Sequence, residues 1–236
     1  MVYFEEIWKK MDDNKNKIKV GFIHNSQNMF LTGNHFDNTY FHFFMEAIRR
    51  HDKLDVTDII HDDILDARTI DPKFDLLMLW ENSLSGMPKD IIGLEELHIP
   101  IISKVGDPNR AKGSIPFHKK WHIDHYFHYY PESLFYSLYP KNFNFTTIRF
   151  GIETKLYQNI TPFDDRIKNT VLNSGAVGTK KIISQIINSI RNPKWNANRY
   201  YYLRTKCNEL PYVSYTPTLN HEYVGDKYPR LLEKYA

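Results

Sequence analysis

Residues 169–191, NTVLNSGAVGTKKIISQIINSIR, predict a short strand, a glycine loop and an amphipathic helix. Residues 170–172 are β-prone, and Gly175 and Gly178 bracket a tight turn in which the backbone can approach a ligand. Thr179 can cap the helix that follows. That helix carries one apolar stripe at helical spacing, formed by Ile182, Ile183, Ile186, Ile187 and Ile190. The segment therefore predicts a strand–loop–helix unit of an α/β domain.

The glycine loop of this segment is a candidate phosphate site. A strand that feeds a helix through glycines leaves backbone N–H groups and the positive helix end facing outward, which favours an anion. Lys180 and Lys181 add positive charge there. The order Gly-Ala-Val-Gly-Thr-Lys over 175–180 is neither a Walker A motif nor Gly-x-Gly-x-x-Gly. This argues against NTP hydrolysis and against standard dinucleotide binding as the function of the loop. A looser phosphate site stays open, as does the alternative that the glycines only turn the chain.

The chain before this unit alternates strand and helix patterns. Residues 74–80, FDLLMLW, form a near-continuous apolar run, as expected for a strand buried on both faces. Further strands are predicted at 18–23, 54–60, 99–105, 123–129 and 143–150, and helices at 3–12, 37–50, 90–97 and 131–138. In the 37–50 helix, the residues predicted to face inward are Tyr40, Phe44, Ala47 and Ile48. The alternation predicts an α/β fold with a doubly wound, mainly parallel, Rossmann-like sheet.

A polar stretch containing Pro162 separates two predicted domains. Residues 1–156 form an N-terminal Rossmann-like domain, residues 157–168 a hinge, and residues 169–236 the start of a second Rossmann-like domain. Later elements of the second domain are a segment at 195–207 that could be a helix or a strand, with the helix favoured, a strand at 212–215 and a helix at 228–235. Only about two strands follow the hinge, whereas a typical sheet has about five or six. The second domain is therefore expected to be incomplete, as in a truncated chain.

Composition narrows the function classes. The 236 residues are 42% hydrophobic and 25% charged, which is ordinary for a soluble globular protein. The net charge of +3 is too small to argue for nucleic acid as a partner. Cys207 is the only cysteine, which excludes an internal disulfide and fits a reducing compartment. No signal peptide and no apolar run of about 20 residues is found, so we expect a soluble cytoplasmic protein without a transmembrane segment. Its oligomeric state is left open.

The candidate catalytic residues follow the ends of predicted strands. In open α/β sheets, ligands bind beyond the carboxyl ends of the strands. Four polar residues at such positions are candidates for a general base, namely His35, Asp37, Glu81 and Asp107. Gly33 would allow the backbone to approach a bound ligand closely. The competing interpretation makes Gly33 a turn residue, Asp37 a helix cap and Glu81 a solvated loop charge.

Four histidines between residues 118 and 128 have spacings that would suit a metal site on a helix. If residues 123–129 form a strand, however, His122 and His125 do not share the geometry that one metal needs. The surrounding aromatic residues favour the strand. We therefore predict no metal ligands. Covalent catalysis has no support either, because Cys207 lacks an identified base and no serine lies in a nucleophile elbow.

Several segments resemble one enzyme family. They are 173–178 (NSGAVG), 199–204 (RYYYLR), 210–213 (LPYV), 215–217 (YTP) and 150–153 (FGIE). The last is similar to the Phe-Gly-Val-Asp entry to the hinge of the GT-B fold. Together with the two-domain layout, these segments make the chain similar to GT-B glycosyltransferases, in a spore-maturation-like group related to glycosyltransferase family 1.

The resemblance implies transfer of a sugar from a nucleotide-sugar donor to the hydroxyl of a carbohydrate or other acceptor, in an interdomain cleft, without a cofactor or an obligatory metal. The first domain would be the acceptor side and would supply the base. The second would be the donor side, and four of its residues match the first glycine loop of that domain, namely Gly175, Gly178, Thr179 and Lys180. Arg204 is a candidate phosphate partner by charge. The chain ends before the segment that would hold the nucleotide's base and ribose, so the resemblance leaves open whether these 236 residues catalyse the transfer on their own.

Two other functions stay open at this point. A non-catalytic carbohydrate- or partner-binding α/β module would keep the fold without the chemistry, and it would bind sugar without nucleotide. A metal-dependent hydrolase using the histidines between residues 118 and 128 would carry stoichiometric metal when purified.

Overall fold

The structure is a computed structural model, and it describes residues 17–27, 38–80, 86–106, 111–149, 151, 154–175, 177, 181–191, 197–216 and 227–235. The predicted helix at 3–12 lies outside these ranges. The chain divides into two compact units. The first holds residues 44–151 with the N-terminal segment to residue 31, and the second holds residues 152–236 with residues 32–43. Each unit is described separately below.

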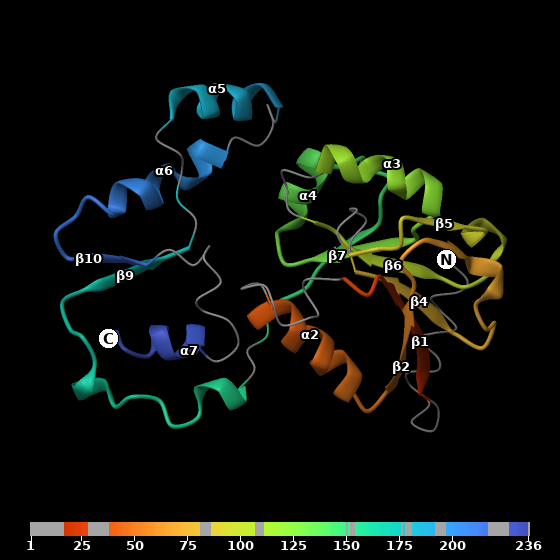
Figure 1. The fold of residues 1–236 in the computed structure, drawn as a ribbon, viewed down its shortest axis with the longest axis horizontal. Helices are drawn as coiled ribbons and strands as arrows, with labels where there is room; N and C mark the ends of the chain where they lie inside the picture. Colours follow the sequence, from red (N-terminus) through yellow and green to blue (C-terminus); the bar gives the residue numbers. More distant parts are fainter. Residues whose placement is uncertain are drawn as a thin grey trace. The chain divides into compact units, whose positions relative to one another are not determined.

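Six strands form the main sheet of the first unit (Figure 1). They are β1 (Ile18–His24), β2 (Leu54–Ile60), β4 (Leu76–Leu79), β6 (Ile101–Lys104), β7 (His125–His128) and β8 (Phe145–Thr147). In space they follow the order β2-β1-β4-β6-β7-β8, and all neighbouring pairs are parallel. This sheet confirms the predicted α/β class with a parallel, Rossmann-like sheet. The chain builds outward from β1 in one direction and from β4 in the other, so the strand order switches between β1 and β4.

Helices cover both faces of this sheet (Figure 1). They are α2 (Asn38–Arg50), α3 (Ala111–Trp121) and α4 (Glu132–Leu138). Phe44 of α2 packs against Phe127 of β7, with ring centroids 6.1 Å apart. The preceding strand residue, Tyr126, packs instead against Phe135 of α4 at 6.3 Å. Because successive strand residues point to opposite faces, α2 lies on one face and α4 on the other.

The larger core lies between the sheet and the α3–α4 side. Leu77 and Leu79 of β4 have no exposed surface, in agreement with the predicted doubly buried strand. An aromatic stack continues this core toward β8, because Phe135 lies 4.0 Å from Phe145 and 4.6 Å from Tyr139 between ring centroids. The high aromatic content of the chain is thus used here for packing.

A second, two-stranded sheet of the first unit corrects one prediction. Residues 90–97 were expected to form a helix, but β5 (Asp90–Ile92) pairs in parallel with β3 (Ile64–Asp66). Gly93 then adopts a left-handed conformation, with φ of 75°, and a 3-10 helix covers only Leu94–Glu96. A further 3-10 helix, Ala67–Thr69, follows β3. Strand pairing with a distant segment therefore overrides the local helical pattern.

Helix α3 was not expected from the sequence. This helix contains Gly113 and Pro116, two residues that disfavour a helix interior. Its buried side chains are Ala111, Ser114 and Trp121. Packing of this face against the sheet side of the core compensates for the poor local propensity.

The second unit contains two parallel strands, β9 (Val171–Ser174) and β10 (Val213–Thr216). The connection between them includes α5 (Ile182–Arg191) and α6 (Ala197–Cys207), as the sequence predicted for this segment. The remaining elements are α7 (Lys227–Leu232) and two 3-10 helices, Thr154–Tyr157 and Phe163–Asp165. That this unit is the start of a second Rossmann-like domain stays a prediction.

Few side chains of the second unit are fully buried. Among its residues that the structure describes, only Pro229 and Leu231 fall in the buried class. The isoleucine stripe predicted on α5 is present, but it faces solvent instead of a core. Across the described part of the whole chain, no helix combines the length and the apolar character needed to cross a membrane.

Candidate functional site

Three strands of the main sheet end in a buried histidine or lysine. His24 is the last residue of β1, Lys104 the last of β6 and His128 the last of β7, and they are 7%, 4% and 1% exposed. Because the strands are parallel, these three residues lie at the same edge of the sheet. With Ser103 they make up four of the five buried polar or charged residues in the described ranges. The carboxyl edge is therefore where the first unit concentrates buried polarity.

The sheet register sets how these side chains are arranged. Ile23, Leu79 and Ser103 lie in one row across β1, β4 and β6. His24 and Lys104 are each the next residue beyond that row, so they share a face of the sheet. His128 follows Phe127, which pairs with Lys104. It therefore belongs to the opposite face, at the end of the neighbouring strand.

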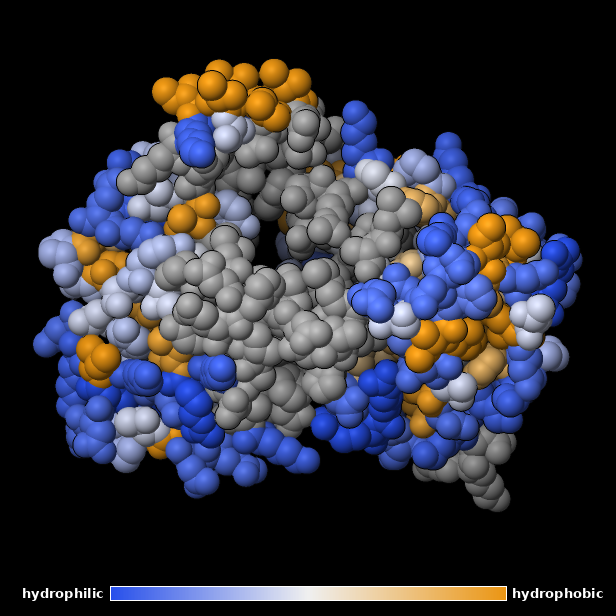
Figure 2. All heavy atoms as spheres, in the orientation of Figure 1, coloured by the Kyte–Doolittle hydropathy of each residue, from blue (hydrophilic) through white to orange (hydrophobic). Residues whose placement is uncertain are grey.

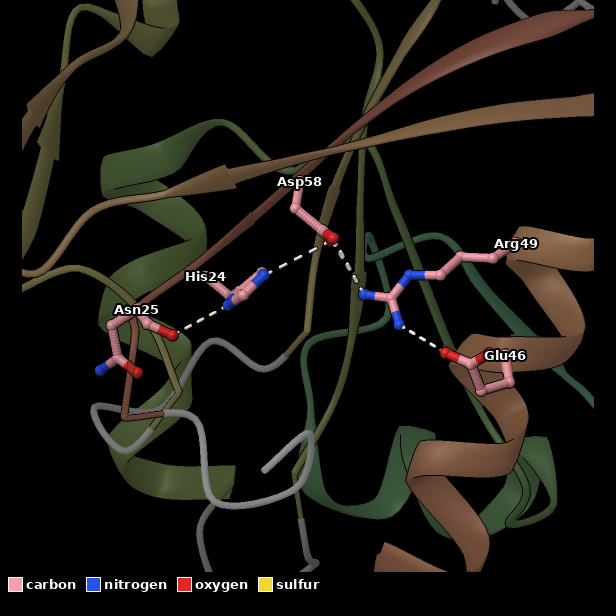
Figure 3. Close-up of polar contacts among 5 residues, drawn as sticks. All are labelled: His24, Asn25, Glu46, Arg49 and Asp58. Carbon is pink, nitrogen blue, oxygen red and sulfur yellow. Dashed lines mark hydrogen bonds and ion pairs between the residues drawn. The ribbon is translucent and has the colours of Figure 1, made fainter. Parts of the chain in front are cut away.

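His24 is held by a polar network that joins β1, β2 and α2 (Figure 3). Its Nδ1 donates to the carbonyl oxygen of Asn25 at 2.8 Å, and its Nε2 lies 3.5 Å from Oδ1 of Asp58. The ring of Phe22 packs beside the imidazole, with centroids 4.8 Å apart. Since both ring nitrogens face oxygen atoms of the scaffold, His24 is oriented by its surroundings.

Arg49 of α2 completes this network (Figure 3). Its Nη2 donates to both carboxylate oxygens of Asp58, at 3.0 and 3.1 Å, and its Nη1 donates to Glu46 at 2.9 Å. Burial lowers the pKa of Arg49, but the hydrogen bonds to Asp58 and Glu46 outweigh it, so the pKa is raised overall. Arg49 thus attaches α2 to β2 and fixes the carboxylate that faces His24.

The chain leaving β1 is tied to the chain that follows β4. The N–H of Asn25 donates to the carbonyl of Gly86 at 3.1 Å, and its Nδ2 donates to the carbonyl of Met87 at 2.9 Å. Ser26 donates to Asp62 from its N–H and its hydroxyl, at 2.8 and 2.9 Å, and these bonds lower the pKa of Asp62. β1 and β4 flank the strand-order switch, where open α/β sheets place their ligands.

Lys104 brings a buried ammonium group to the same edge. Its Nζ donates to the carbonyl of Val105 at 3.2 Å and lies 5.4 Å from the centroid of the Trp80 ring. Trp80 directly follows β4, so this cation–π contact spans the ends of two neighbouring strands. A buried cation at a strand end is a group that can attract an anionic ligand.

His128 is the most unusual residue of the site. Neither ring nitrogen has a hydrogen-bond partner within the described ranges, although the side chain is 1% exposed. Burial, assisted by the charge of Lys104, lowers the pKa of His128 to about 2. The imidazole is therefore neutral at physiological pH and presents one N–H donor and one acceptor. Two ligand hydroxyls, one accepting from the N–H and one donating to the other nitrogen, would satisfy both atoms.

Most of the predicted site residues cannot be placed. His35, Asp37, Glu81, Asp107 and Gly33 lie outside the described residues, as do Gly178, Thr179 and Lys180. Their roles stay predictions. The loops that leave β1, β4 and β6 contain the first five of them.

Gly175 and Arg204, both in the second unit, are described. Gly175 has φ of 103°, a conformation that favours glycine, and its carbonyl accepts a hydrogen bond from Tyr215 at 3.0 Å. Arg204 lies on α6, with its guanidinium 5.6 Å from the ring of Tyr201. Its carbonyl accepts a hydrogen bond from Asn173 of β9 at 2.9 Å. The turn geometry at Gly175 agrees with both interpretations of the glycine loop.

The histidines between residues 118 and 128 contact different partners. Nδ1 of His118 lies 2.8 Å from the hydroxyl of Tyr126, and Nε2 of His125 lies 2.8 Å from that of Thr146. Burial lowers the pKa of both imidazoles. No group of three or more His, Cys, Asp or Glu side chains suited to a metal ion occurs in the part of the chain that the structure describes.

Sequence reasoning missed Lys104 and His128 as ligand-binding candidates. Lys104 was included in the predicted strand 99–105, and His128 was weighed only as a metal ligand. One signal was available for Lys104, since a lysine near the end of an otherwise apolar strand is unusual for a doubly buried strand.

No family model, no curated protein and no solved structure matches the chain. The resemblance to GT-B glycosyltransferases therefore rests on the sequence segments alone. The carboxyl-edge site rests on the geometry of His24, Lys104 and His128.

Proposed function

We propose that the carboxyl edge of the six-stranded sheet binds a phosphorylated, hydroxyl-rich ligand, and that the protein is a glycosyltransferase using a nucleotide-sugar donor. The observation that carries the proposal is His128, a buried neutral imidazole without a hydrogen-bond partner among the described residues, at the same edge of the sheet as Lys104. Buried polar atoms in native proteins are nearly always satisfied. Two sugar hydroxyls would satisfy the imidazole, and a phosphate would suit the ammonium.

In the proposed reaction, an acceptor oxygen attacks the anomeric carbon of the donor sugar. The bond between that carbon and the diphosphate breaks, and the nucleoside diphosphate leaves with the electron pair. His128 orients a hydroxyl group, and Lys104 contributes positive potential toward the phosphate. Because its pKa is about 2, His128 is a poor proton acceptor, so the general base is one of His35, Asp37, Glu81 and Asp107.

The test is ligand binding by the full chain, measured by calorimetry with a panel of nucleoside diphosphates, nucleotide sugars and free sugars. We expect at least one nucleotide sugar to bind. His128→Leu should weaken that binding about tenfold, because one or two hydrogen bonds to the ligand are lost. His125→Leu is the matched control on the same strand, since its Nε2 is already bonded to Thr146.

The two parts of the proposal fail separately. Binding that is equally strong in wild type and His128→Leu would remove the carboxyl edge as the site. Absence of binding to every nucleotide and nucleotide sugar would remove the glycosyltransferase. Release of nucleoside diphosphate from the bound donor, followed by phosphorus NMR, distinguishes catalysis from binding.

The low basicity of His128 also favours a second candidate, a non-catalytic carbohydrate-binding module. Such a module needs the donor and the acceptor of a neutral imidazole but no proton transfer. It predicts binding of free sugars that depends on His128, no affinity for nucleoside diphosphates and no turnover of nucleotide sugars.

A further inference from the structure

Helix α5 of the second unit is amphipathic, but its apolar side faces solvent, whereas the apolar side of a packed helix faces the core. Its five isoleucines are 41–74% exposed, namely Ile182, Ile183, Ile186, Ile187 and Ile190. Ser184, Gln185 and Ser189 on the other side are half-buried. Figure 2 shows the apolar side chains gathered over this helix as one orange surface. The helix thus contacts its own unit with polar residues and presents its apolar face outward.

An apolar helix face of this kind is normally covered by the protein core or by a binding partner. A surface helix of a globular protein turns its apolar stripe toward the core, and exposed apolar patches mark interaction sites. The neighbouring helix α6, which contacts α5, exposes Leu203 and Tyr202 at 73% and 57%. A second helix of the unit thus also exposes large apolar side chains.

The charge of the surrounding sequence indicates what kind of partner would cover the apolar face of α5. Residues 166–208 contain nine of the 31 Lys and Arg residues and none of the 28 Asp and Glu residues. Outside this segment, 22 basic residues stand against 28 acidic ones. Lys180 and Lys181 immediately precede α5, Arg191 is its last residue, and Lys194 follows shortly after. Positive charge is thus concentrated at both ends of the exposed isoleucine stripe.

An apolar helix face flanked by basic residues matches the surface of a bilayer that contains anionic lipids. Helices of this kind lie in the interfacial plane, with apolar side chains at the acyl boundary and Lys and Arg at the headgroups. At 10 residues, α5 is about 15 Å long, too short to span a bilayer but sufficient to lie along it. A second copy of the chain is disfavoured, because pairing two α5 faces would bring their basic ends together.

We propose that the isoleucine face of α5 docks the second unit onto an anionic membrane surface. The isoleucines enter the boundary between headgroups and acyl chains, and the basic residues at the helix ends contact lipid phosphates. The proposal is independent of the carboxyl-edge site in the first unit.

The experiment is co-sedimentation of the full chain with vesicles of pure phosphatidylcholine and of phosphatidylcholine with 30% phosphatidylglycerol, at about 0.1 M salt. We expect the protein to pellet with the anionic vesicles. Ile183→Ser with Ile190→Ser should lower partitioning at least tenfold. The matched control is Ile60→Ser with Ile64→Ser, because Ile60 and Ile64 are similarly exposed on the first unit, at 56% and 57%. Circular dichroism confirms that both doubly substituted proteins remain folded.

A second variant tests the electrostatic part without touching the apolar face. Lys180→Gln with Lys181→Gln should weaken binding to anionic vesicles several-fold, and raising the salt to about 0.5 M should do the same to the wild type. Failure of the wild type to pellet with anionic vesicles overturns the proposal, as does equal pelleting of the Ile183/Ile190 variant. Light scattering tests self-association of the same face. If the wild type is a dimer that does not bind vesicles, and the Ile183/Ile190 variant is a monomer, the isoleucine face of α5 is a dimer interface instead.

Discussion

His128 combines a proposed binding role with a cost to stability. Its two ring nitrogens are buried without partners in the described ranges, and each such atom destabilises the fold because it loses its bonds to water. Proteins keep a group of this kind where function requires it. The residue therefore links the proposed ligand site to a measurable stability effect.

We predict that His128→Leu stabilises the protein by about 1–2 kcal/mol at pH 7, since an apolar side chain of similar size removes both unsatisfied atoms. The pH dependence should also change. The unfolded chain binds a proton on this histidine near its ordinary pKa, whereas the folded chain does so only near pH 2, so the wild type loses stability as the pH falls below about 6.5.

The loss is at most about 1.4 kcal/mol per pH unit from this histidine. Urea unfolding between pH 4.5 and 7.5, followed by the fluorescence of the buried Trp80 and Trp121, measures it. His118 and His125 contribute in the same direction, so the comparison of wild type with His128→Leu isolates His128. Parallel pH curves for the two proteins would contradict the prediction.

At the residue scale, the sequence predicted a ligand site at the carboxyl edge of the sheet, but it did not predict the buried polar side chains that lie at this edge. The rule that ligands lie beyond strand ends selected the loops after β1, β4 and β6. It could not identify Lys104 and His128, because their burial depends on which strands become neighbours. The order β4-β6-β7 is a property of the assembled sheet.

At the scale of single elements, two glycines have opposite roles. Gly21 lies in β1, and a Cβ atom there would come within 2.8 Å of Leu77 and 3.0 Å of Ile59. Gly113 lies in α3, and a Cβ atom there would meet nothing within 4 Å. A side chain at the first glycine would crowd its neighbours, whereas the second glycine only weakens its helix.

We predict that Gly21→Ala destabilises the first unit by about 1–3 kcal/mol, through overpacking between β1 and its neighbours. Gly113→Ala should instead stabilise it by about 0.5–1 kcal/mol, because alanine is the better helix former. Chemical unfolding of both variants beside the wild type checks the signs. A neutral or stabilising Gly21→Ala would show that Leu77 and Ile59 can move aside at little cost.

The elements themselves were predictable where the local pattern and the tertiary structure agree. The strands β1, β2 and β4 were predicted from the sequence, and α2 ends at Arg50 as expected. Within α2, however, Ala47 is exposed although it was predicted to face inward, and Met45 is fully buried. The 3.6-residue period defines a stripe, but the angle at which the helix meets the sheet decides which side of that stripe is covered.

At the scale of the whole molecule, the two units differ in how much they bury. The first unit holds nearly all the buried hydrophobic residues that the structure describes, and the second contributes Leu231. Local stability follows burial and hydrogen bonding, so the two units should open with different free energies.

Hydrogen exchange of the full chain measures this difference. We predict that amides of β9 and β10 exchange at least about 100-fold faster than those of β1 and β4, because the two-stranded sheet has little packing to protect it. Anionic vesicles should slow exchange in α5 if that helix docks on them. Equal protection of β9 and β1 in the free protein would mean that the second unit is stabilised by contacts other than buried apolar side chains.

The strand order also has a consequence for synthesis on the ribosome. β1 can pair with β2 early, but its other edge is reserved for β4, and the chain between β1 and β4 must be made first. At ~5–20 residues per second, translation of residues 25–75 takes several seconds. During that time the nascent chain presents an open, apolar strand edge, a known template for aggregation. The yield of native protein should therefore depend on translation speed and on chaperones that bind the growing chain.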